Sequence, residues 1–380
     1  MGKNVIVCLD GTGNQFKEDI SNVVKLFRVL IRDQTQVAFY HPGVGTLADP
    51  DYKTPIAKKI NKLLGLAFGR GVTRNVEQAY SYLMDHYAEG DRLFIFGFSR
   101  GAYTARVLAA FIHSCGLLEP GCQNLIPYAM KLYKKVDFPV LNRFKSTFGR
   151  KIEIDFLGLW DCVSTTGWVY NPMFLPYTTN NQSVRIIRHA IAIDERRSFF
   201  KEMRWGRKFA AVQDIKEVWF SGVHSDVGGG YPEKNSALSK IPLQWMIEQA
   251  LNLLADQAAD QERFGIRIDP DKYNRYVLGK GSKKYVEPDS GAERHESMHG
   301  AWKWVQWVPK SVWLAQEGRE AIRFPLPYRV IEPKAILHRS VLQRMQTRDY
   351  RPPNLGGRSI DEIMRDFNIE PPLPDATHDA

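Results

Sequence analysis

The sequence lacks the features of membrane-spanning, disulfide-stapled and zinc-binding proteins. No apolar run approaches the roughly 20 residues that a membrane-spanning helix needs. The four cysteines are scattered and form no C-x-x-C pair; they are Cys8, Cys115, Cys122 and Cys162. We therefore expect neither a disulfide framework nor a zinc site, and this cysteine usage fits a reducing compartment.

Targeting signals are also missing from the N-terminus. Residues 1–6 have no signal-peptide layout, and Ile6 stands where N-myristoylation needs Ser or Thr. We expect the chain to be made and kept in the cytoplasm, or to be exported by a route that reads no such signal. Residues 371–380 contain proline and aspartate, and we expect them to form a disordered tail.

Two phosphate-handling motifs are absent as well. The G-x-x-x-x-G-K-S/T loop of nucleotide-binding proteins does not occur. Asp10-Gly11-Thr12 follows an apolar run, as in the haloacid-dehalogenase phosphatases, but Cys8 replaces the aspartate that those enzymes use as nucleophile. Nucleic-acid binding would rest on the net charge of +10 alone, so we expect no nucleic-acid partner, and we expect no cofactor.

What the sequence contains is an alternation of strand and helix signals. Apolar runs predict strands over residues 5–9, 37–40, 93–98, 152–159 and 218–223, with a further element over 188–193. Helical spacing of apolar residues predicts helices over residues 21–32, 75–87, 102–112, 243–259 and 335–346. Because the strand runs are apolar throughout, we expect an α/β fold: a mostly parallel central sheet with helices on both faces and helical insertions.

One short motif in this pattern carries chemistry. Residues 97–101, Gly-Phe-Ser-Arg-Gly, form a G-x-S-x-G pattern between an apolar strand run and a helix start. This setting is typical of the nucleophile elbow of α/β-hydrolases, in which a serine projects from a tight strand-to-helix turn. We therefore expect an α/β-hydrolase-like sheet with Ser99 as nucleophile; the alternative is that Ser99 only caps the helix.

A nucleophilic serine needs a base and an acid that orients the base. In α/β-hydrolases the acid and then the histidine follow the serine in chain order, each after a strand. Asp161 and His224 follow the next suitable strand runs, which predicts the acid at Asp161 and the general base at His224. The alternatives that stay open are Asp226 and Asp155 for the acid, and His189, His113 and His338 for the base.

An oxyanion hole should lie beside the nucleophile. We expect it to use the backbone N–H of Arg100, the residue after the serine, and a second N–H from Gly11 or Thr12. Asp10 and Asp226 are expected to support the loops around the site. The alternative for the first loop is a turn that Asp10 and Asn14 hold together.

The sequence signals weaken after residue 235, and residues 260–300 look rich in loops. We expect a single domain over residues 1–370. Within it, a catalytic core covers residues 1–235, and a helical and loop extension covers residues 236–370.

Several stretches together resemble one protein family. The chain is similar to the α/β-hydrolase-like family, long of unknown function, that includes the first class of bacterial type VI secretion lipase effectors. A looser similarity covers residues 338–352. The matching stretches are in family order: residues 9–14 (LDGTGN), 41–46 (HPGVGT), 97–106 (GFSRGAYTAR), 158–161 (GLWD), 189–197 (HAIAIDERR) and 222–231 (GVHSDVGGGY).

The resemblance implies a triad of Ser99, Asp161 and His224, the same residues that chain order indicates. It also implies ester hydrolysis, with phospholipids as the substrates of the secreted members and an antibacterial effector role. A lipid or other ester substrate, a secretion spike and an immunity protein are the partners that this implies. A general esterase for small soluble esters and a catalytically inactive scaffold are the alternatives.

Two segments bear on peripheral membrane contact. Residues 53–68 are basic and amphipathic, which favours either a lid or membrane-surface helix or an ordinary surface helix. Tryptophans crowd a later basic stretch that includes Lys303 and Lys310, and they suit either a membrane interface or a packed aromatic cluster. These tryptophans are Trp302, Trp304, Trp307 and Trp313.

Overall fold

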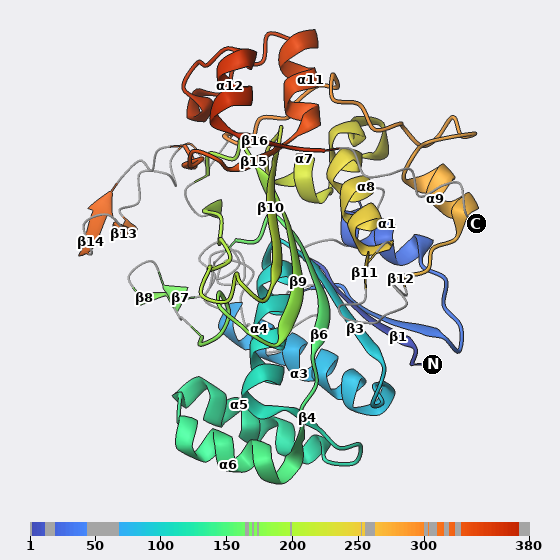
Figure 1. The fold of residues 1–380 in the computed structure, drawn as a ribbon, viewed down its shortest axis with the longest axis vertical. Coiled ribbons are helices and arrows are strands. Elements are labelled where there is room, and N and C mark those ends of the chain that lie inside the picture. The colour runs from blue at the N-terminus through green and yellow to red at the C-terminus, as the bar shows by residue number, and fades with distance from the viewer. Residues whose placement is uncertain are drawn as a thin grey trace, which may run out of the picture.

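The computed structural model describes residues 2–11, 20–43, 68–163, 167–168, 171–172, 175–197, 200–251, 253–254, 263–299, 303, 310–314, 319–323 and 328–371. Its centre is an eight-stranded sheet in the order β16-β15-β10-β9-β6-β3-β1-β2, and all neighbours in it are parallel (Figure 1). The strands are β1 (Asn4–Leu9), β2 (Gln36–His41), β3 (Arg92–Phe98), β6 (Ile154–Trp160), β9 (Val184–Ala192), β10 (Asp214–Phe220), β15 (Ile336–His338) and β16 (Asn368–Glu370). The prediction of an α/β fold with a mostly parallel sheet is confirmed.

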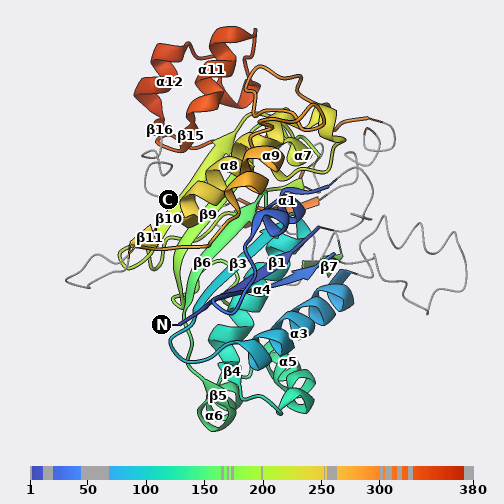
Figure 2. The same cartoon turned by 90° about the vertical axis from the view of Figure 1, so that its right-hand side faces the viewer.

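Helices cover both faces of this sheet, because alternate side chains of each apolar strand point to opposite faces (Figure 2). Val5 and Val7 pack toward one helical layer, and Ile6 and Cys8 pack toward the other. The first layer consists of α3 (Phe68–His86), α4 (Arg100–Cys115), α5 (Ile126–Lys135) and α6 (Phe138–Phe148). The second consists of α1 (Asn22–Val29), α8 (Ala237–Leu251) and α9 (Pro270–Tyr276).

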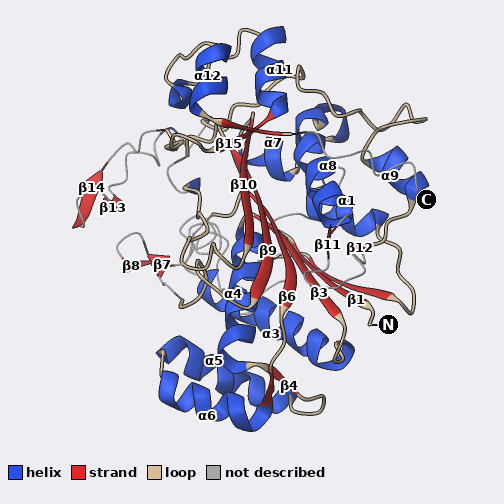
Figure 3. Cartoon of the chain, viewed as in Figure 1, coloured by secondary structure: helices blue, strands red, loops and turns tan. Residues whose placement is uncertain are grey.

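The extension expected over residues 236–370 is not only helices and loops, because β15 and β16 add two strands to the sheet (Figure 3). The helix predicted over residues 335–346 is wrong in its first part: Ile336 and Leu337 pair with β10, and the helix begins only at Arg339. A two-residue apolar pair suits a strand and a helix equally, so periodicity did not separate them. The helices that cover these strands are α11 (Arg339–Thr347) and α12 (Ile360–Asp366).

Other elements were not expected from the sequence. The α5–α6 pair and α9 are helices in regions without a strong periodic signal, although Asp269 caps α9 and Pro270 begins it. Among the described residues, four two-stranded antiparallel pairs lie outside the main sheet. They are β4 (Leu117–Leu118) with β5 (Gly149–Arg150), β7 (Gly167–Trp168) with β8 (Asn171–Pro172), β11 (Leu253–Leu254) with β12 (Arg263–Phe264), and β13 (Lys310–Leu314) with β14 (Arg319–Arg323).

The strand order contains a switch point beside β1. The chain passes from β1 to β2 on one side and then returns to place β3 on the other side of β1. In open parallel sheets, ligands bind in the crevice outside the carboxyl ends of the strands at such a point. Gly11 and Ser99 follow β1 and β3 closely, and a Cβ added to Gly11 would lie 3.4 Å from the Cβ of Ser99. The fold therefore puts Ser99 at the edge of the sheet where a binding site is expected.

Candidate active site

Ser99 occupies a strained turn between β3 and α4. Its φ is 58° and its ψ is −121°, a backbone conformation that residues with side chains rarely adopt. Gly97 and Gly101 permit the turn: a Cβ on Gly97 would lie 2.6 Å from the Gly101 carbonyl oxygen, and one on Gly101 would overlap the Leu9 carbonyl oxygen. The Ser99 side chain makes no capping hydrogen bond to α4, so the alternative of a simple helix cap is not supported.

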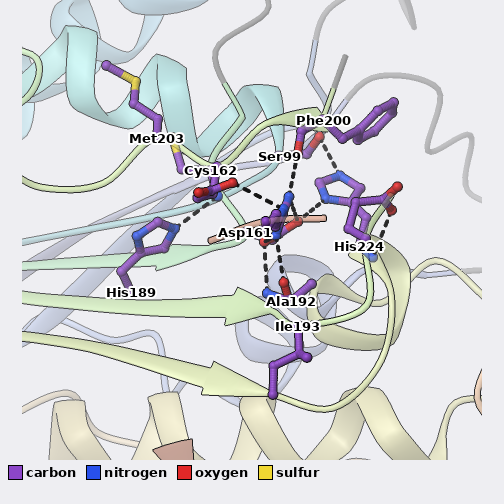
Figure 4. Close-up of polar contacts among 12 residues, drawn as sticks. Ser99, Asp161, Cys162, His189, Ala192, Ile193, Phe200, Met203 and His224 are labelled. Atoms are coloured by element: carbon purple, nitrogen blue, oxygen red, sulfur yellow. Dashed lines mark hydrogen bonds and ion pairs between the residues drawn. The ribbon is translucent and has the colours of Figure 1, made fainter. Parts of the chain in front are cut away.

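The Ser99 hydroxyl lies at one end of a chain of two hydrogen bonds (Figure 4). Its Oγ is 2.8 Å from Nε2 of His224, and Nδ1 of His224 is 2.6 Å from Oδ2 of Asp161. A carboxylate can only accept, so Nδ1 donates to Asp161 and Nε2 is left to accept from the hydroxyl. The structure thus brings together the three residues that the sequence places after three different strands.

Asp161 is fixed by the neighbouring strand β9. Its N–H donates to the Ala190 carbonyl oxygen at 2.7 Å, and its Oδ1 accepts from the Ala192 N–H at 2.9 Å. Its φ of 37° is in the left-handed region, so the backbone is held in a costly conformation at this point too. The side chain is fully buried and is hydrogen-bonded to the His224 ring beside it (Figure 4).

Sequence reasoning missed Arg329, whose guanidinium contacts Asp161. Its Nη1 lies 2.5 Å from Oδ1 of Asp161 and its Nη2 lies 3.0 Å from Oδ2. The same guanidinium donates to the carbonyl oxygens of Ala192, at 2.9 Å, and Phe200. Nothing in the sequence around Arg329 forms a motif, so no local signal identified it.

The charges at the site favour an ionised acid and a neutral base. Burial alone would raise the pKa of Asp161, but Arg329 and His224 hold it well below its usual range. Burial lowers the pKa of His224 from its ordinary value of 6.5, and this outweighs the opposite effect of Asp161. At neutral pH the imidazole is therefore uncharged and its Nε2 can accept a proton.

Aromatic rings and a carboxylate surround His224. The rings of Phe98 and Phe200 lie 4.7 and 4.8 Å from the imidazole, measured between ring centroids. The backbone N–H of His224 donates to Oε2 of Glu195 at 3.2 Å. His224 also begins the short helix α7 (His224–Gly228), so its backbone and its ring are both held.

The backbone N–H groups expected to form the oxyanion hole are those of Arg100 and of Gly11 or Thr12. Arg100 begins α4, and N–H groups in a first helical turn point out of the helix end. The Gly11 N–H donates to Oδ1 of Asp10 at 2.7 Å, so the prediction of Gly11 as the second donor disagrees with this contact. Thr12 lies outside the described residues. Asp10 also accepts from Ser21 and Tyr40, which fits its expected role of supporting the loop.

The other acid candidates do not contact the His224 ring in any described hydrogen bond. Asp226 accepts from the Val223 N–H at 3.0 Å and from Nδ1 of His295 at 2.6 Å, which fits its expected role of supporting the loop. Asp155 accepts from the Leu93 N–H at 2.9 Å, near the start of β6. Of these candidates, Asp161 is the one hydrogen-bonded to His224.

The other histidines are held by structural contacts. His189 accepts from the Cys162 N–H at 3.1 Å through Nε2 (Figure 4), and its Nδ1 lies 3.2 Å from Oε1 of Glu217. His113 contacts the Ser183 hydroxyl, and His338 caps α11. None of the described hydrogen bonds of these three histidines goes to Ser99.

Some predictions fall outside the part of the chain that is described. Residues 53–67 and three of the tryptophans, Trp302, Trp304 and Trp307, are not covered, and of Trp313 only the backbone in β13 is. Among the described helices, none is long and apolar enough to cross a membrane. The described residues also contain no group of three His, Cys, Asp or Glu side chains suited to a metal ion.

Comparison with known proteins finds, among others, one similar sequence and two similar solved structures. An uncharacterized protein of Saccharomyces cerevisiae, YEL023C, is 33% identical over 222 residues, which are 53% of this chain and 32% of the yeast protein. An uncharacterized protein from Pseudomonas aeruginosa is similar in structure, with 20% identity, a TM-score of 0.36, and coverage of 64% of this chain and 45% of that chain. The Tle1 effector bound to the VgrG spike of the type VI secretion system is also similar in structure. Its sequence identity is 19% and the TM-score is 0.36, and the match covers 62% of this chain and 52% of that chain.

The chain spans about a third of the yeast relative and about half of the two solved structures. A family model described as the catalytic domain of Tle1-like phospholipase effectors of the type VI secretion system matches residues 3–249. This match covers more than half of the chain and includes Ser99, Asp161 and His224. The chain therefore belongs to the family of Tle1-like phospholipase effector catalytic domains.

Proposed function

We propose that this chain hydrolyses acyl esters of phospholipids, with Ser99 as nucleophile, His224 as general base and Asp161 as orienting acid. The observation that carries the proposal is the path of two short hydrogen bonds from Ser99 through His224 to Asp161. The family supplies the substrate class, because its model is named for phospholipase effectors. The basic net charge of +10 favours contact with anionic lipid.

The proposed reaction has two halves. In the first, Ser99 Oγ attacks the acyl carbonyl carbon while His224 Nε2 takes the hydroxyl proton, and the N–H of Arg100 donates to the developing oxyanion. The carbon–oxygen bond to the lipid alcohol then breaks as His224 returns the proton to the leaving oxygen. In the second half, His224 activates a water molecule that releases the fatty acid from Ser99.

The pH dependence follows from the base. His224 must be neutral to accept the serine proton, and burial holds its pKa below 6.5. We therefore expect kcat/KM to be near its maximum at pH 7 and to fall as the pH drops through a midpoint below 6.5. Initial rates on a soluble p-nitrophenyl ester between pH 4 and pH 8 measure this; a midpoint clearly above 6.5 would contradict the assignment.

Two measurements test the function itself. A fluorophosphonate probe should label Ser99, and mass spectrometry of the digested protein identifies the labelled serine. Vesicles of phosphatidylethanolamine and phosphatidylglycerol should release fatty acid when the protein is added. Labelling at another serine would refute the nucleophile. Hydrolysis of short soluble esters alone would indicate a general esterase, and no hydrolysis at all would indicate an inactive scaffold.

A secreted effector role is part of the same proposal. The family name links the chain to type VI secretion, and the Tle1 relative is solved with its VgrG spike. We expect a gene for a spike protein and a gene for a periplasmic immunity protein beside the gene for this chain, and co-purification of the chain with that spike. If neither gene lies beside the gene for this chain, delivery by type VI secretion is contradicted, while the proposed hydrolysis is unaffected.

A further inference from the structure

The geometry points to Arg329 as a positioning residue for the reaction: it fixes the Asp161 carboxylate in the orientation that meets His224 and offsets part of its negative charge. This inference rests on the proposed function. Arg329 lies outside the residues that the family model matches, so the site would depend on a segment beyond the matched domain.

The first argument is the completeness of the contacts on Asp161. Oδ1 accepts from the Ala192 N–H and from Nη1 of Arg329, and Oδ2 accepts from His224 and from Nη2 of Arg329. These four hydrogen bonds match the four acceptor sites of a carboxylate. Because the guanidinium fork is planar and contacts both oxygens, rotation of the carboxylate would break both of its bonds to Arg329.

The second argument is the anchoring of Arg329 itself. Its side chain is 4% exposed, and the guanidinium also donates to the carbonyl oxygens of Ala192 and Phe200. The side chain of Asn354 donates to the Arg329 carbonyl oxygen at 3.3 Å. The cation is thus held from several sides, as a group that positions another must be.

The third argument is energetic. A buried ion pair gains little net stability, because desolvation of the two charges offsets their attraction. A catalytic acid needs only one charge, and a cation beside it reduces the stabilisation that Asp161 gives to a protonated His224. The ion pair between Asp161 and Arg329 therefore affects the base: it helps to keep His224 in its neutral, proton-accepting form. A purely packing role for Arg329 would not have this effect.

Other charged groups also face the site. Arg197 stacks on the Phe200 ring that contacts His224, Glu195 accepts from the His224 N–H, and Glu202 lies 3.4 Å from Nε of Arg329. His189 and Cys162 lie on the far side of Asp161. Among the described residues, Arg329 is the one cation hydrogen-bonded to Asp161.

Replacement of Arg329 by methionine should have two effects. We expect kcat to fall by about 10²-fold, because Asp161 loses two of its four hydrogen bonds and His224 is less well aligned. We also expect the acid limb of the pH profile of kcat/KM to move up by about 1 pH unit, because the imidazolium then faces the full charge of Asp161. KM should change little. Arg329→Lys should keep the acid limb near its original place while still lowering kcat, because the charge remains and the fork is lost.

A second buried arginine serves as the matched control. Arg344 is 6% exposed, and its Nη1 donates to the carbonyl oxygens of Ser290 and Ala292 rather than to the triad. Arg344→Met should leave the acid limb unmoved. If the limb also stays in place in an active Arg329→Met variant, the positioning role is wrong. If that variant does not fold, Arg329→Lys decides: an unchanged kcat overturns the proposal.

A readout without turnover separates this inference from the proposed function. The downfield proton NMR signal of His224 Nδ1 can be followed with pH in the wild type and in the variants. We expect its midpoint to rise in Arg329→Met. If the wild type hydrolyses no ester but the midpoint still rises in Arg329→Met, the proposed function is refuted and the electrostatic role of Arg329 is kept. If the wild type is active but the midpoint does not rise in Arg329→Met, the proposed function is kept and the electrostatic role of Arg329 is refuted.

Discussion

Replacing Ser99 with alanine is expected to lower kcat/KM for ester hydrolysis by at least about 10⁴-fold while the protein stays folded. The change removes only Oγ, whose described side-chain hydrogen bond goes to His224. The buried backbone turn is kept by Gly97 and Gly101, so the thermal midpoint should move by only a few degrees. Hydrolysis of p-nitrophenyl esters and of phospholipid vesicles measures the loss.

The matched control for this prediction is Ser225→Ala. Ser225 directly follows His224 in the sequence and has a similarly small hydroxyl side chain, but no role in the reaction is assigned to it. Its removal should leave most of the activity, and the fluorophosphonate probe should still label the protein. Full activity in Ser99→Ala, or loss of labelling in Ser225→Ala only, would show that the nucleophile is elsewhere.

The second large effect is expected at Asp161. Asp161→Asn should reduce kcat by about 10⁴-fold, because the amide does not hold the imidazole in the productive tautomer. It should also lower the free energy of unfolding by about 3–5 kcal/mol, because Arg329 is left as a buried charge without its carboxylate. Urea unfolding followed by circular dichroism measures the second effect independently of activity.

A double-mutant cycle separates these two effects. In Asp161→Asn with Arg329→Met, the unpaired charge is gone, so most of the lost unfolding free energy should return while activity stays low. Pairing Asp161→Asn with Arg344→Met should give additive losses instead. If both double variants behave alike, the ion pair between Asp161 and Arg329 is not the source of the destabilisation.

The same ion pair predicts a dependence of stability on acid. The pKa of Asp161 is lower in the folded protein than its ordinary value of 3.8, so the stabilisation is present above that pH and is lost as the pH falls below it. The difference in unfolding free energy between the wild type and Asp161→Asn should therefore shrink below pH 3.8. A difference that is constant between pH 7 and pH 3 would contradict the pairing.

The candidate site was largely predictable because of where its residues stand in the chain. Ser99, Asp161 and His224 each follow an apolar strand, and the carboxyl ends of parallel strands meet at one edge of the sheet. A pattern of buried strands thus already implies that these side chains converge. The same reasoning predicted a mostly parallel central sheet, helices in the regions of α1, α3, α4 and α8, and the boundaries of α1 and β3 to within a few residues.

The rest depends on contacts that leave no local pattern. Arg329 reaches Asp161 across 168 residues, and a single arginine in an aperiodic region looks like any surface cation. β15 and β16 are only three residues long each, too short for alternation to be recognised. The hydrogen bond from the Gly11 N–H to the side chain of Asp10 depends on one torsion of that side chain, which the sequence does not specify.

The long separation between Asp161 and Arg329 has a consequence for protein synthesis. At about 5–20 residues per second, the ribosome adds the arginine roughly 10–30 s after the aspartate. Ser99 and His224 are also made before Arg329, so a nascent chain carries the three reacting side chains without the guanidinium that aligns them. The proposed hydrolysis would thus reach full activity only after the chain has been extended past Arg329 and has folded.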